Sequence, residues 1–589
     1  MITRQDISLF FDQEAEASKE SWEALMELPV KERIRKRKAI ENVVLDKEYS
    51  EFSTENHVLL KAKVKVNLSD FKEGDCLLLH EERKHSGIKC TLYKFEDDET
   101  LILDVFPPNM PVDKDTYYDK NLILDKDLVD LRAYVYDSFV SELIHKGATN
   151  DDFWIDLLFN NPRKPEYIET EKCKEKLNET ITSFELALMP KQKEAILNSI
   201  SAKDYYLIQG PPGTGKSFVL SLVILEEMID LNHKVVVIGP NHLAINNVLR
   251  QVVKLLPQIH DIVVKVGQPY NAPEKVKTED KEIEVKNNQN LNVLAVNKLE
   301  NPVLIGLTPH SLHSSRARGL ECDTLVIDEA GQMSIPLALM GMIRAKKVIL
   351  AGDHKQLSPI IVSDKVDEQM KKSAFQSLLT DDNCTMLDVS FRMCEPICEF
   401  VSELFYDGKV KAMKPGCGDR ILCDNPLYDF HHPVVLHHID DEGEQVSQKE
   451  ADFIVNVIVS YLNMGLNADE IGVLSPFRAQ AALIRRLVRK SDDIKEDDKQ
   501  KIAIDTIDKM QGQEREAIIV SLAAGKRDYV QEMADFLYNP NKLNVAFSRA
   551  KSKLIIVGNI SELKLVNAVE YPHIQKMLSS KHIMIINRK

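Results

Sequence analysis

Gly210-Pro-Pro-Gly-Thr-Gly-Lys-Ser217 is the stretch of this 589-residue chain that decides its fold. The apolar run Tyr205–Ile208 precedes it, and the helix-like run Phe218–Glu227 follows it. A strand, a glycine-rich turn and a helix in this order form a phosphate-binding loop, in which backbone N–H groups and the helix N-terminus face the phosphate oxygens. Because the motif and its flanks agree, an accidental glycine-rich turn is disfavoured.

The loop predicts a role for each of its polar side chains. We expect Lys216 to reach the β- and γ-phosphates of a nucleotide, and the Ser217 hydroxyl to bind Mg²⁺. The predicted nucleotide-binding set of this loop is Gly210, Pro211, Pro212, Gly213, Thr214, Gly215, Lys216 and Ser217.

From about residue 185 onwards, short apolar runs alternate with helix-like segments, which predicts parallel sheets covered by helices. The first series of expected strands is Tyr205–Ile208, Val235–Ile238, Val303–Leu307, Thr324–Ile327 and Val348–Leu350. The second series is Val434–Leu436, Ile471–Leu474, Ile502–Thr506, Ala517–Leu522 and Leu554–Val557. Two series predict two α/β domains, at residues 185–384 and 385–589. The polar segment at about 258–300 is interpreted as a surface insertion in the first domain.

The residues before this region have a different character. Residues 1–54 are charged and are expected to be a helical region. Residues 55–115 contain several short β-type runs between polar turns, which predict a small accessory β-barrel. Residues 116–184 return to helical patterning and are expected to form a helical stalk.

The composition indicates a globular protein, with 44% hydrophobic and 29% charged residues. The net charge of −16 gives no overall attraction to nucleic acid, although a local basic groove is compatible with it. Met1–Glu20 has no long apolar core, and no run is long enough to cross a membrane. Nine scattered cysteines show no disulfide spacing, so we expect a reduced, intracellular and cytoplasmic protein, or a nuclear one in a eukaryote.

Two carboxylates end the predicted strand in Leu325-Val-Ile-Asp-Glu-Ala330. We expect Asp328 to hold Mg²⁺, and Glu329 to orient and deprotonate the attacking water. Gln356 follows the next predicted strand, where its amide can hydrogen-bond either the γ-phosphate or that water.

Arg392 and Arg549 lie in the predicted second α/β domain. An arginine that reaches across a cleft can stabilise the charge that develops during phosphoryl transfer. Placing both arginines on the second domain makes closure of the cleft depend on the nucleotide.

Further motifs occur in a specific order around these residues: Met189-Pro-Lys-Gln192, Gly239-Pro-Asn-His-Leu-Ala244, Asp328-Glu-Ala-Gly-Gln332, Ser390-Phe-Arg-Met393, Leu404-Phe-Tyr-Asp-Gly408, Gly472-Val-Leu-Ser-Pro-Phe477, Thr506-Ile-Asp-Lys-Met-Gln-Gly-Gln-Glu514 and Asn544-Val-Ala-Phe-Ser-Arg-Ala-Lys551. In this order they resemble the superfamily 1 helicases, and within them the up-frameshift and senataxin-like branch. The strong motifs cover roughly residues 185–560.

The resemblance implies two RecA-like domains with ATP between them and a single strand of DNA or RNA across both, moving 5′ to 3′. It also implies that Gln192 contacts the adenine, that Phe391 stacks on it and that Glu514 approaches the ribose. Phenylalanine replaces the tyrosine common in the family at position 391, which keeps the stacking face and loses the hydroxyl. The strand contacts that the motifs imply are Pro240, Asn241, Thr308, Pro309, Ser475 and Thr506.

Two functions fit these observations. The first is an ATP-dependent helicase or translocase that unwinds duplexes or displaces bound protein. The alternative is a nucleotide-controlled nucleic-acid clamp or scaffold ATPase without processive unwinding. An AAA-type oligomeric ATPase is disfavoured because both candidate arginines lie in the same chain, so we expect a monomer. The motifs leave open whether the strand is DNA or RNA, and they indicate no particular protein partner.

Overall fold

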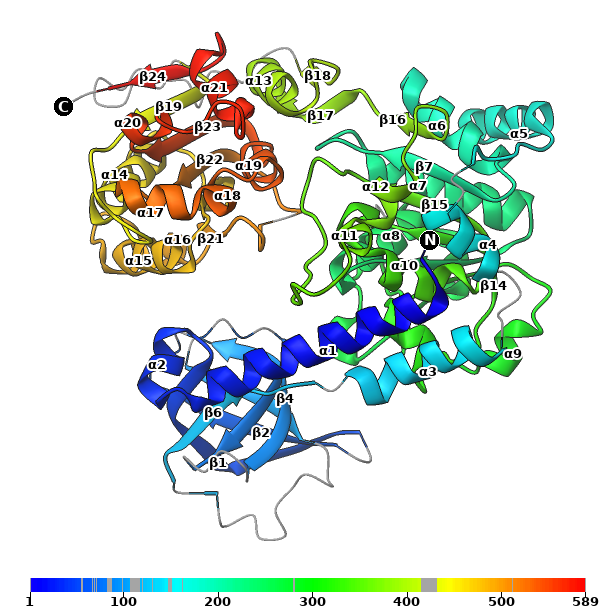
Figure 1. The fold of residues 1–589 in the computed structure, drawn as a ribbon, viewed down its shortest axis with the longest axis horizontal. Helices are drawn as coiled ribbons and strands as arrows, with labels where there is room; N and C mark the ends of the chain where they lie inside the picture. Colours follow the sequence, from blue (N-terminus) through cyan, green and yellow to red (C-terminus); the bar gives the residue numbers. More distant parts are fainter. Residues whose placement is uncertain are drawn as a thin grey trace.

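The chain forms a β-barrel, a helical stalk and two α/β domains (Figure 1). The computed structural model describes residues 2–54, 57–65, 67, 69, 71, 73–81, 87–97, 99–105, 117–118, 120–129, 131–146, 151–160, 163–278, 281–414, 432–510 and 512–587. None of the helices in these ranges combines the length and the apolarity needed to cross a membrane.

The barrel is a closed antiparallel sheet with the strand order β1-β2-β5-β4-β3-β6. Its strands are β1 (Ala39–Thr54), β2 (His57–Lys63), β3 (Cys76–His80), β4 (Gly87–Asp97), β5 (Thr100–Val105) and β6 (Leu122–Lys126). It therefore begins inside the segment expected to be helical, and it ends inside the segment expected to be the stalk. In β1 the apolar Val43 and Leu45 face the core, whereas the charged Glu41 and Lys47 are exposed, so the strand does not appear as an apolar run in the sequence.

A buried ion cluster fastens helix α2 (Val30–Arg35) to the barrel. Arg33 donates from Nε and Nη2 to the two carboxylate oxygens of Asp125, each at 2.8 Å. His80 Nε2 lies 2.8 Å from Oδ2 of the same carboxylate, and all three side chains are buried. Burial raises the pKa of Asp125, but the hydrogen bonds from His80 and Arg33 outweigh it and hold the pKa below its ordinary value.

Replacing Arg33 with leucine is expected to destabilise the barrel by about 3–5 kcal/mol, because it leaves the Asp125 carboxylate buried without its cation. The midpoint of the first thermal unfolding transition measures this. The matched control is Arg35→Leu in the same helix, since the Arg35 side chain is 81% exposed and its pairing with Glu32 spans 3.9 Å. Equal midpoints for the two variants would contradict the prediction.

The stalk joins the barrel to the first α/β domain (Figure 1). Helix α1 (Arg4–Glu27) packs against the helical segment 132–146, with the ring centroid of Phe11 4.3 Å from that of Tyr136. At the other end of α1, Trp22 Nε1 donates to the carbonyl oxygen of Lys126 in β6 at 3.1 Å. The segment 132–146 contains α3 (Asp137–Ser141), and α4 (Asp151–Ile155) follows it. Helix α5 (Thr170–Ser183) was expected in the stalk, but its buried Cys173 and Leu177 pack in the core of the first α/β domain.

The first α/β domain contains an eight-stranded parallel sheet with the order β12-β9-β13-β8-β14-β15-β7-β16. Its strands are β7 (Tyr205–Gln209), β8 (Lys234–Ile238), β9 (Val263–Val266), β12 (Lys286–Asn288), β13 (Val303–Gly306), β14 (Cys322–Ile327), β15 (Ala345–Gly352) and β16 (Cys384–Met386). Its helices are α6 (Pro190–Ser201), α7 (Lys216–Leu225), α8 (His242–Leu255), α9 (Val293–Asn297), α10 (Ile335–Met342), α11 (Glu368–Lys371) and α12 (Ala374–Leu378).

All five strands expected in this domain are confirmed, but the polar segment 258–300 is more than a surface insertion. It contributes β9 and β12 to the central sheet, and it also forms a hairpin of β10 (Val276–Lys277) and β11 (Glu282–Ile283). β9 is apolar but only four residues long, and β12 is a polar strand of three residues at the sheet edge, so neither gives a clear strand pattern in the sequence.

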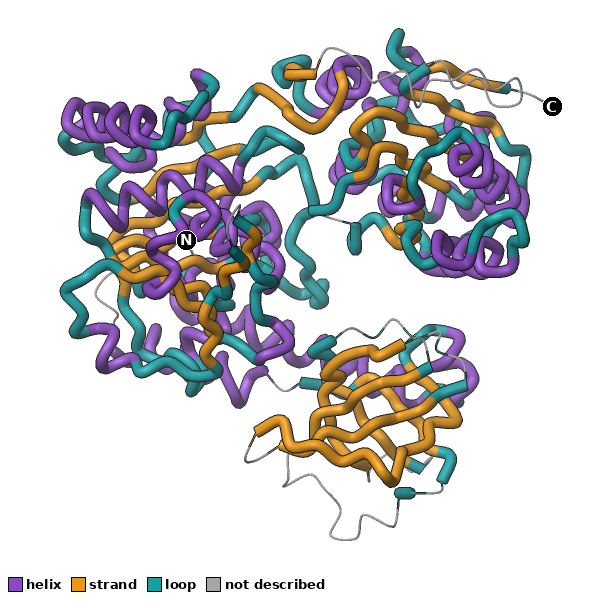
Figure 2. Tube along the Cα trace, turned by 180° about the vertical axis from the view of Figure 1, so that it is seen from behind, coloured by secondary structure: helices purple, strands orange, loops and turns teal. Residues whose placement is uncertain are grey.

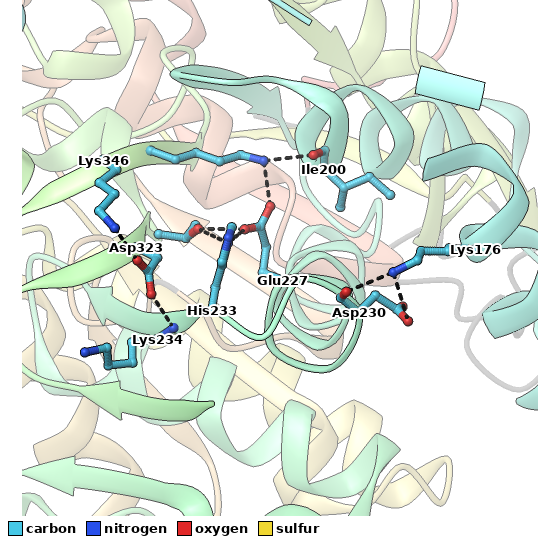
Figure 3. A network of polar contacts seen from close by, with 10 residues as sticks. Lys176, Ile200, Glu227, Asp230, His233, Lys234, Asp323 and Lys346 are labelled. Carbon is cyan, nitrogen blue, oxygen red and sulfur yellow. Dashed lines mark hydrogen bonds and ion pairs between the residues drawn. The ribbon is translucent and has the colours of Figure 1, made fainter. Parts of the chain in front are cut away.

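A buried polar network lies at the end of this sheet where the strands begin (Figure 3). Glu227 accepts hydrogen bonds from Lys347 Nζ at 2.6 Å and from Thr324 Oγ1 at 2.6 Å, and it lies 2.7 Å from His233 Nδ1. Burial opposes the charge of Glu227, but Lys347 outweighs burial and lowers its pKa. Apart from Gln192, which lies in α6, the functional residues predicted in this domain follow the opposite, carboxyl ends of the strands.

The second α/β domain contains a six-stranded parallel sheet with the order β21-β20-β22-β23-β19-β24. Its strands are β19 (Val434–His438), β20 (Ile471–Ser475), β21 (Ala503–Thr506), β22 (Arg515–Ser521), β23 (Ala550–Gly558) and β24 (Met584–Ile586), of which only β24 was not expected. Its helices are α13 (Glu395–Phe405), α14 (Gln448–Asn463), α15 (Arg478–Lys490), α16 (Glu496–Lys499), α17 (Arg527–Glu532), α18 (Ala534–Leu537), α19 (Pro540–Phe547), α20 (Ile560–Leu563) and α21 (Pro572–Ser579). Figure 2 shows the two sheets side by side from behind, with the barrel below them.

The connection between the two sheets differs from expectation. Ser390-Phe-Arg-Met393, expected inside the second domain, belongs to β17 (Val389–Cys394), which pairs with β18 (Lys411–Lys414) in a separate two-stranded sheet. Met393 nevertheless packs in the core of the second domain. Cys394, at the end of β17, is disulfide-bonded, so the expectation of fully reduced cysteines is wrong at this position.

Candidate functional site

One cavity of about 1580 Å³ lies between the carboxyl ends of the first sheet and the second α/β domain. Its walls come from the phosphate-binding loop, from the segments after β8, β13, β14 and β15, from β17 and from the second domain. Two aromatic residues of the barrel region, Phe71 and Phe95, also line it. The cavity therefore joins the barrel and both α/β domains in one space.

The phosphate-binding loop adopts the backbone conformation that its sequence predicts. Gly213 and Gly215 have φ angles of +75° and +81°, a region that side chains disfavour. Helix α7 begins directly afterwards at Lys216, so its free N–H groups face the cavity. The predicted loop residues, Gly210 to Ser217, all line the cavity.

Lys216 lies between the two predicted carboxylates. Its Nζ donates to Asp328 Oδ1 at 2.8 Å and to Glu329 Oε1 at 2.7 Å. Burial would lower the pKa of Lys216, but the two carboxylates outweigh burial and raise it. An ammonium group bound in this way can exchange its carboxylate partners for phosphate oxygens. The oxygens of Asp328 and Ser217 are hard donors of the kind that suit Mg²⁺, so the residues present fit a magnesium–nucleotide complex.

Glu329 has an unusual backbone conformation, with a φ of +55°. A left-handed conformation in a residue other than glycine costs roughly 1–3 kcal/mol and concentrates at functional sites. Gln332 donates from Nε2 to Oε2 of Glu329 at 2.9 Å and so fixes the carboxylate. Burial raises the pKa of Glu329, but Lys216 outweighs burial and keeps the pKa below its ordinary value. Glu329 is therefore an oriented, ionised carboxylate that can accept a proton.

Gln356 lines the same cavity and follows β15. Its Nε2 donates to Asp353 Oδ2 at 3.0 Å. Because a carboxylate only accepts hydrogen bonds, this contact fixes which end of the amide faces Asp353.

The β17 segment lies on the phosphate-binding loop. Phe391 N donates to the carbonyl oxygen of Gly213 at 2.8 Å, and the ring of Phe391 is 38% exposed in the cavity. Arg392 Nε donates to Glu514 Oε2 at 2.5 Å, and Lys551 holds the other carboxylate oxygen at 3.0 Å. Arg392 and Glu514 thus occur as an ion pair at the cavity wall.

Arg549 lies deeper in the cavity wall and is only 2% exposed. It donates from Nε to the carbonyl oxygen of Val545 at 3.0 Å and from Nη1 to that of Gln513 at 3.3 Å. Burial and then the neighbouring charge of Arg392 lower the pKa of Arg549 to about 9, so it stays charged at neutral pH. Two cations on one wall favour an anionic ligand between them.

Gln192 hydrogen-bonds to the backbone of the phosphate-binding loop and is not among the residues that line the cavity. Its Nε2 donates to the carbonyl oxygen of Thr214 at 3.1 Å, and its Oε1 accepts from Met189 N at 3.0 Å. Both ends of the amide therefore contact backbone groups, and contact with an adenine stays a prediction.

Five of the six predicted strand-contact residues line the cavity: Pro240, Asn241, Thr308, Pro309 and Thr506. Ser475 does not belong to this lining, because it is buried and its Oγ accepts from Phe477 N at 3.2 Å. Asn241 is itself engaged, since Oδ1 accepts from Ala244 N and caps α8. Binding of a strand at these residues stays a prediction.

Sequence reasoning missed several residues of the cavity. Arg478, Lys509 and Lys542 of the second domain supply a local basic character that the net charge of −16 conceals. Arg478 is the first residue of α15, so a basic side chain shortly after a predicted strand was the available signal. Phe71 and Phe95 carry no comparable signal, because their position depends on how the barrel is oriented.

Two family models, each described as an AAA domain, match the region that builds this cavity. The first matches residues 187–302 and 286–364, and the second matches residues 370–561. Together they span both parallel sheets up to β23.

Several curated proteins are similar to most of the chain. An uncharacterized ATP-dependent helicase of Methanocaldococcus jannaschii is 25% identical over 84% of this chain and 91% of its own length. The DNA polymerase alpha-associated DNA helicase A of Schizosaccharomyces pombe is 29% identical over 66% of each chain. A DNA replication ATP-dependent helicase/nuclease of Homo sapiens is 24% identical over 78% of this chain, which spans 44% of that longer protein.

Proposed function

The chain belongs to the superfamily 1 helicases, in their up-frameshift and senataxin-like branch, and we propose that it uses ATP and Mg²⁺ to move along single-stranded nucleic acid, unwinding duplexes or displacing bound protein. The relatives that carry an activity in their names are helicases, which favours this function over a static clamp. Movement from 5′ to 3′, the monomeric state and the choice of DNA or RNA belong to the proposal.

The observation that supports the proposal most strongly is the single cavity. It places the phosphate-binding loop in the same space as the predicted strand contacts Asn241 and Thr506, one from each α/β domain. A ligand at the phosphate loop and a strand at the domain ends would both favour the closed arrangement of the two domains. Binding of either ligand therefore strengthens binding of the other, which is the coupling that a translocase needs.

The side chains have complementary roles in hydrolysis. Glu329 accepts the proton of the attacking water, and Gln332 keeps its carboxylate oriented. Lys216 and Arg549 stabilise the negative charge that develops on the transferred phosphoryl group. Mg²⁺, held by Ser217 and Asp328, would neutralise part of that charge.

The first test is ATP hydrolysis by the whole chain alone, with single-stranded DNA and with single-stranded RNA, at one fixed salt concentration. We expect stimulation by at least one polymer, and Lys216→Ala is expected to lower the stimulated rate by roughly 10²–10³-fold because the phosphates lose their buried cation. The matched control is Lys203→Ala, which removes an exposed lysine that pairs with Glu166. Stimulated hydrolysis at the wild-type rate in Lys216→Ala would refute the assignment of this site.

Displacement of streptavidin from one end of a labelled strand separates movement from static binding. A 5′-to-3′ translocase accelerates loss of streptavidin from a 3′ end and leaves a 5′ end unaffected. ATP hydrolysis without displacement from either end would support the clamp instead, and faster loss from the 5′ end would reverse the proposed polarity.

A further inference from the structure

The loop that carries Gln356 belongs to the first α/β domain in sequence, and side chains of the second domain also contact it. Tyr406 donates from its hydroxyl to Asp353 Oδ2 at 2.5 Å. Asn544 Nδ2 donates to the carbonyl oxygen of Lys355 at 2.7 Å. Leu357, in the same loop, packs against the hydrophobic core of the second domain.

Asn541 adds further hydrogen bonds to the same loop. Its Nδ2 lies 3.3 Å from the carbonyl oxygen of His354 and 3.2 Å from Ser358 Oγ. Asn541 and Asn544 both belong to α19, so one helix of the second domain contacts the loop at several points. Movement of α19 would therefore act on this loop, which Gln209 of β7 also holds through Asp353.

Asp353 is the centre of the network and is buried. Its Oδ1 accepts from Gln209 Nε2 and from Lys355 N, both at 3.1 Å. Its Oδ2 accepts from Gln356 Nε2 at 3.0 Å and from Tyr406 at 2.5 Å. Each oxygen thus has two donors, and the Tyr406 hydroxyl is the donor that comes from the other domain.

Tyr406 is suited to this position. It follows α13, is 4% exposed and belongs to the hydrophobic core of the second domain. Burial and then the Asp353 carboxylate raise its pKa well above the ordinary value, so the phenol keeps its proton and donates it in the hydrogen bond. The same oxygen accepts from Asn544 Nδ2 at 2.7 Å, which joins α13, α19 and Asp353 in one buried chain.

We infer that Tyr406 and Asn544 are positioning residues that carry the Gln356 loop with the second domain, so that closure of the two domains sets where Gln356 lies in the cavity. Arg549 lies two residues after the end of α19, so it moves with Asn544. One rotation of the second domain would then bring Arg549 and Gln356 to the phosphate together. This inference rests on the proposed function.

The test is Tyr406→Phe in the whole chain, compared with the wild type in unstimulated and strand-stimulated ATP hydrolysis. This change removes a buried donor to Asp353 and an acceptor for Asn544. We therefore expect the stimulated kcat to fall about tenfold. The KM for ATP and the unstimulated rate are expected to change less than twofold, because neither depends on closure by a strand. The matched control is Tyr538→Phe, another buried tyrosine of the second domain, which should leave every rate unchanged.

A second variant distinguishes the loss of this contact from a simple folding defect. Asn544→Ala should lower the same stimulated kcat, and the double variant should lose less than the product of the two single losses because both residues act on one loop. Equal losses of stimulated and unstimulated hydrolysis in Tyr406→Phe, or losses that multiply in the double variant, would overturn the inference. The inference would also be overturned if Tyr406→Phe hydrolysed ATP at the wild-type rates while a strand stimulates the wild type. A wild type that neither DNA nor RNA stimulates would overturn the proposed function, and this inference with it.

Discussion

Replacement of Arg549 with alanine is expected to lower strand-stimulated ATP hydrolysis by roughly 10³–10⁵-fold. The guanidinium is almost fully buried, and its hydrogen bonds go to the carbonyl oxygens of Val545 and Gln513. Burying a cation near a second cation, Arg392, is costly, and an arriving phosphate offsets this cost. Because charge builds up on the phosphoryl group in the transition state, the loss should appear in kcat. Steady-state hydrolysis over a range of ATP concentrations measures it.

Two further variants define what Arg549 contributes. Arg549→Lys keeps the charge but loses the planar fork, so only a small part of the activity should return. Arg527→Ala is the matched control, because that side chain is 61% exposed and pairs with Glu562 at 3.5 Å. A kcat within tenfold of the wild type in Arg549→Ala would show that the second domain does not supply this charge.

Glu329→Gln is expected to reduce hydrolysis by roughly 10²–10⁴-fold while ATP still binds. The amide has the same shape as the carboxylate but cannot accept a proton from water. The wild-type carboxylate is ionised because Lys216 holds its pKa down, and Gln332 already orients it. A single-turnover measurement separates this chemical step from ATP binding.

The Glu329→Gln variant should also hold a nucleic-acid strand more tightly in the presence of ATP, because hydrolysis no longer releases closure. Fluorescence anisotropy of a labelled strand with and without ATP measures this gain. Glu368→Gln, on an 85% exposed side chain, is the matched control and should change neither rate nor affinity. Unchanged hydrolysis in Glu329→Gln would assign the proton acceptor to another group.

The fold was predictable where backbone requirements are local. The glycines with positive φ and the start of α7 at Lys216 follow from the eight residues of the phosphate loop, and the strand before it follows from the apolar run Tyr205–Ile208. Buried parallel strands are also visible as apolar runs, and for this reason both α/β domains were found. Strands that are very short, or that carry charged residues between their apolar ones, were missed, namely β1 in the barrel and β9, β12 and β16 in the first sheet. Their place depends on partners elsewhere in the chain rather than on their own periodicity.

The sequence by itself predicted which residues carry the chemistry, because the phosphate loop, the carboxylates Asp328 and Glu329, and the arginines occur in one specific order. Only the tertiary structure decided how these residues meet. It paired Lys216 with both carboxylates, placed β17 on the phosphate loop, and attached the Gln356 loop to Asn544, which lies 189 residues away from Lys355 in the chain. The physical reason is that periodicity and glycine positions report local backbone geometry, whereas hydrogen bonds between domains depend on how separately folded layers pack together.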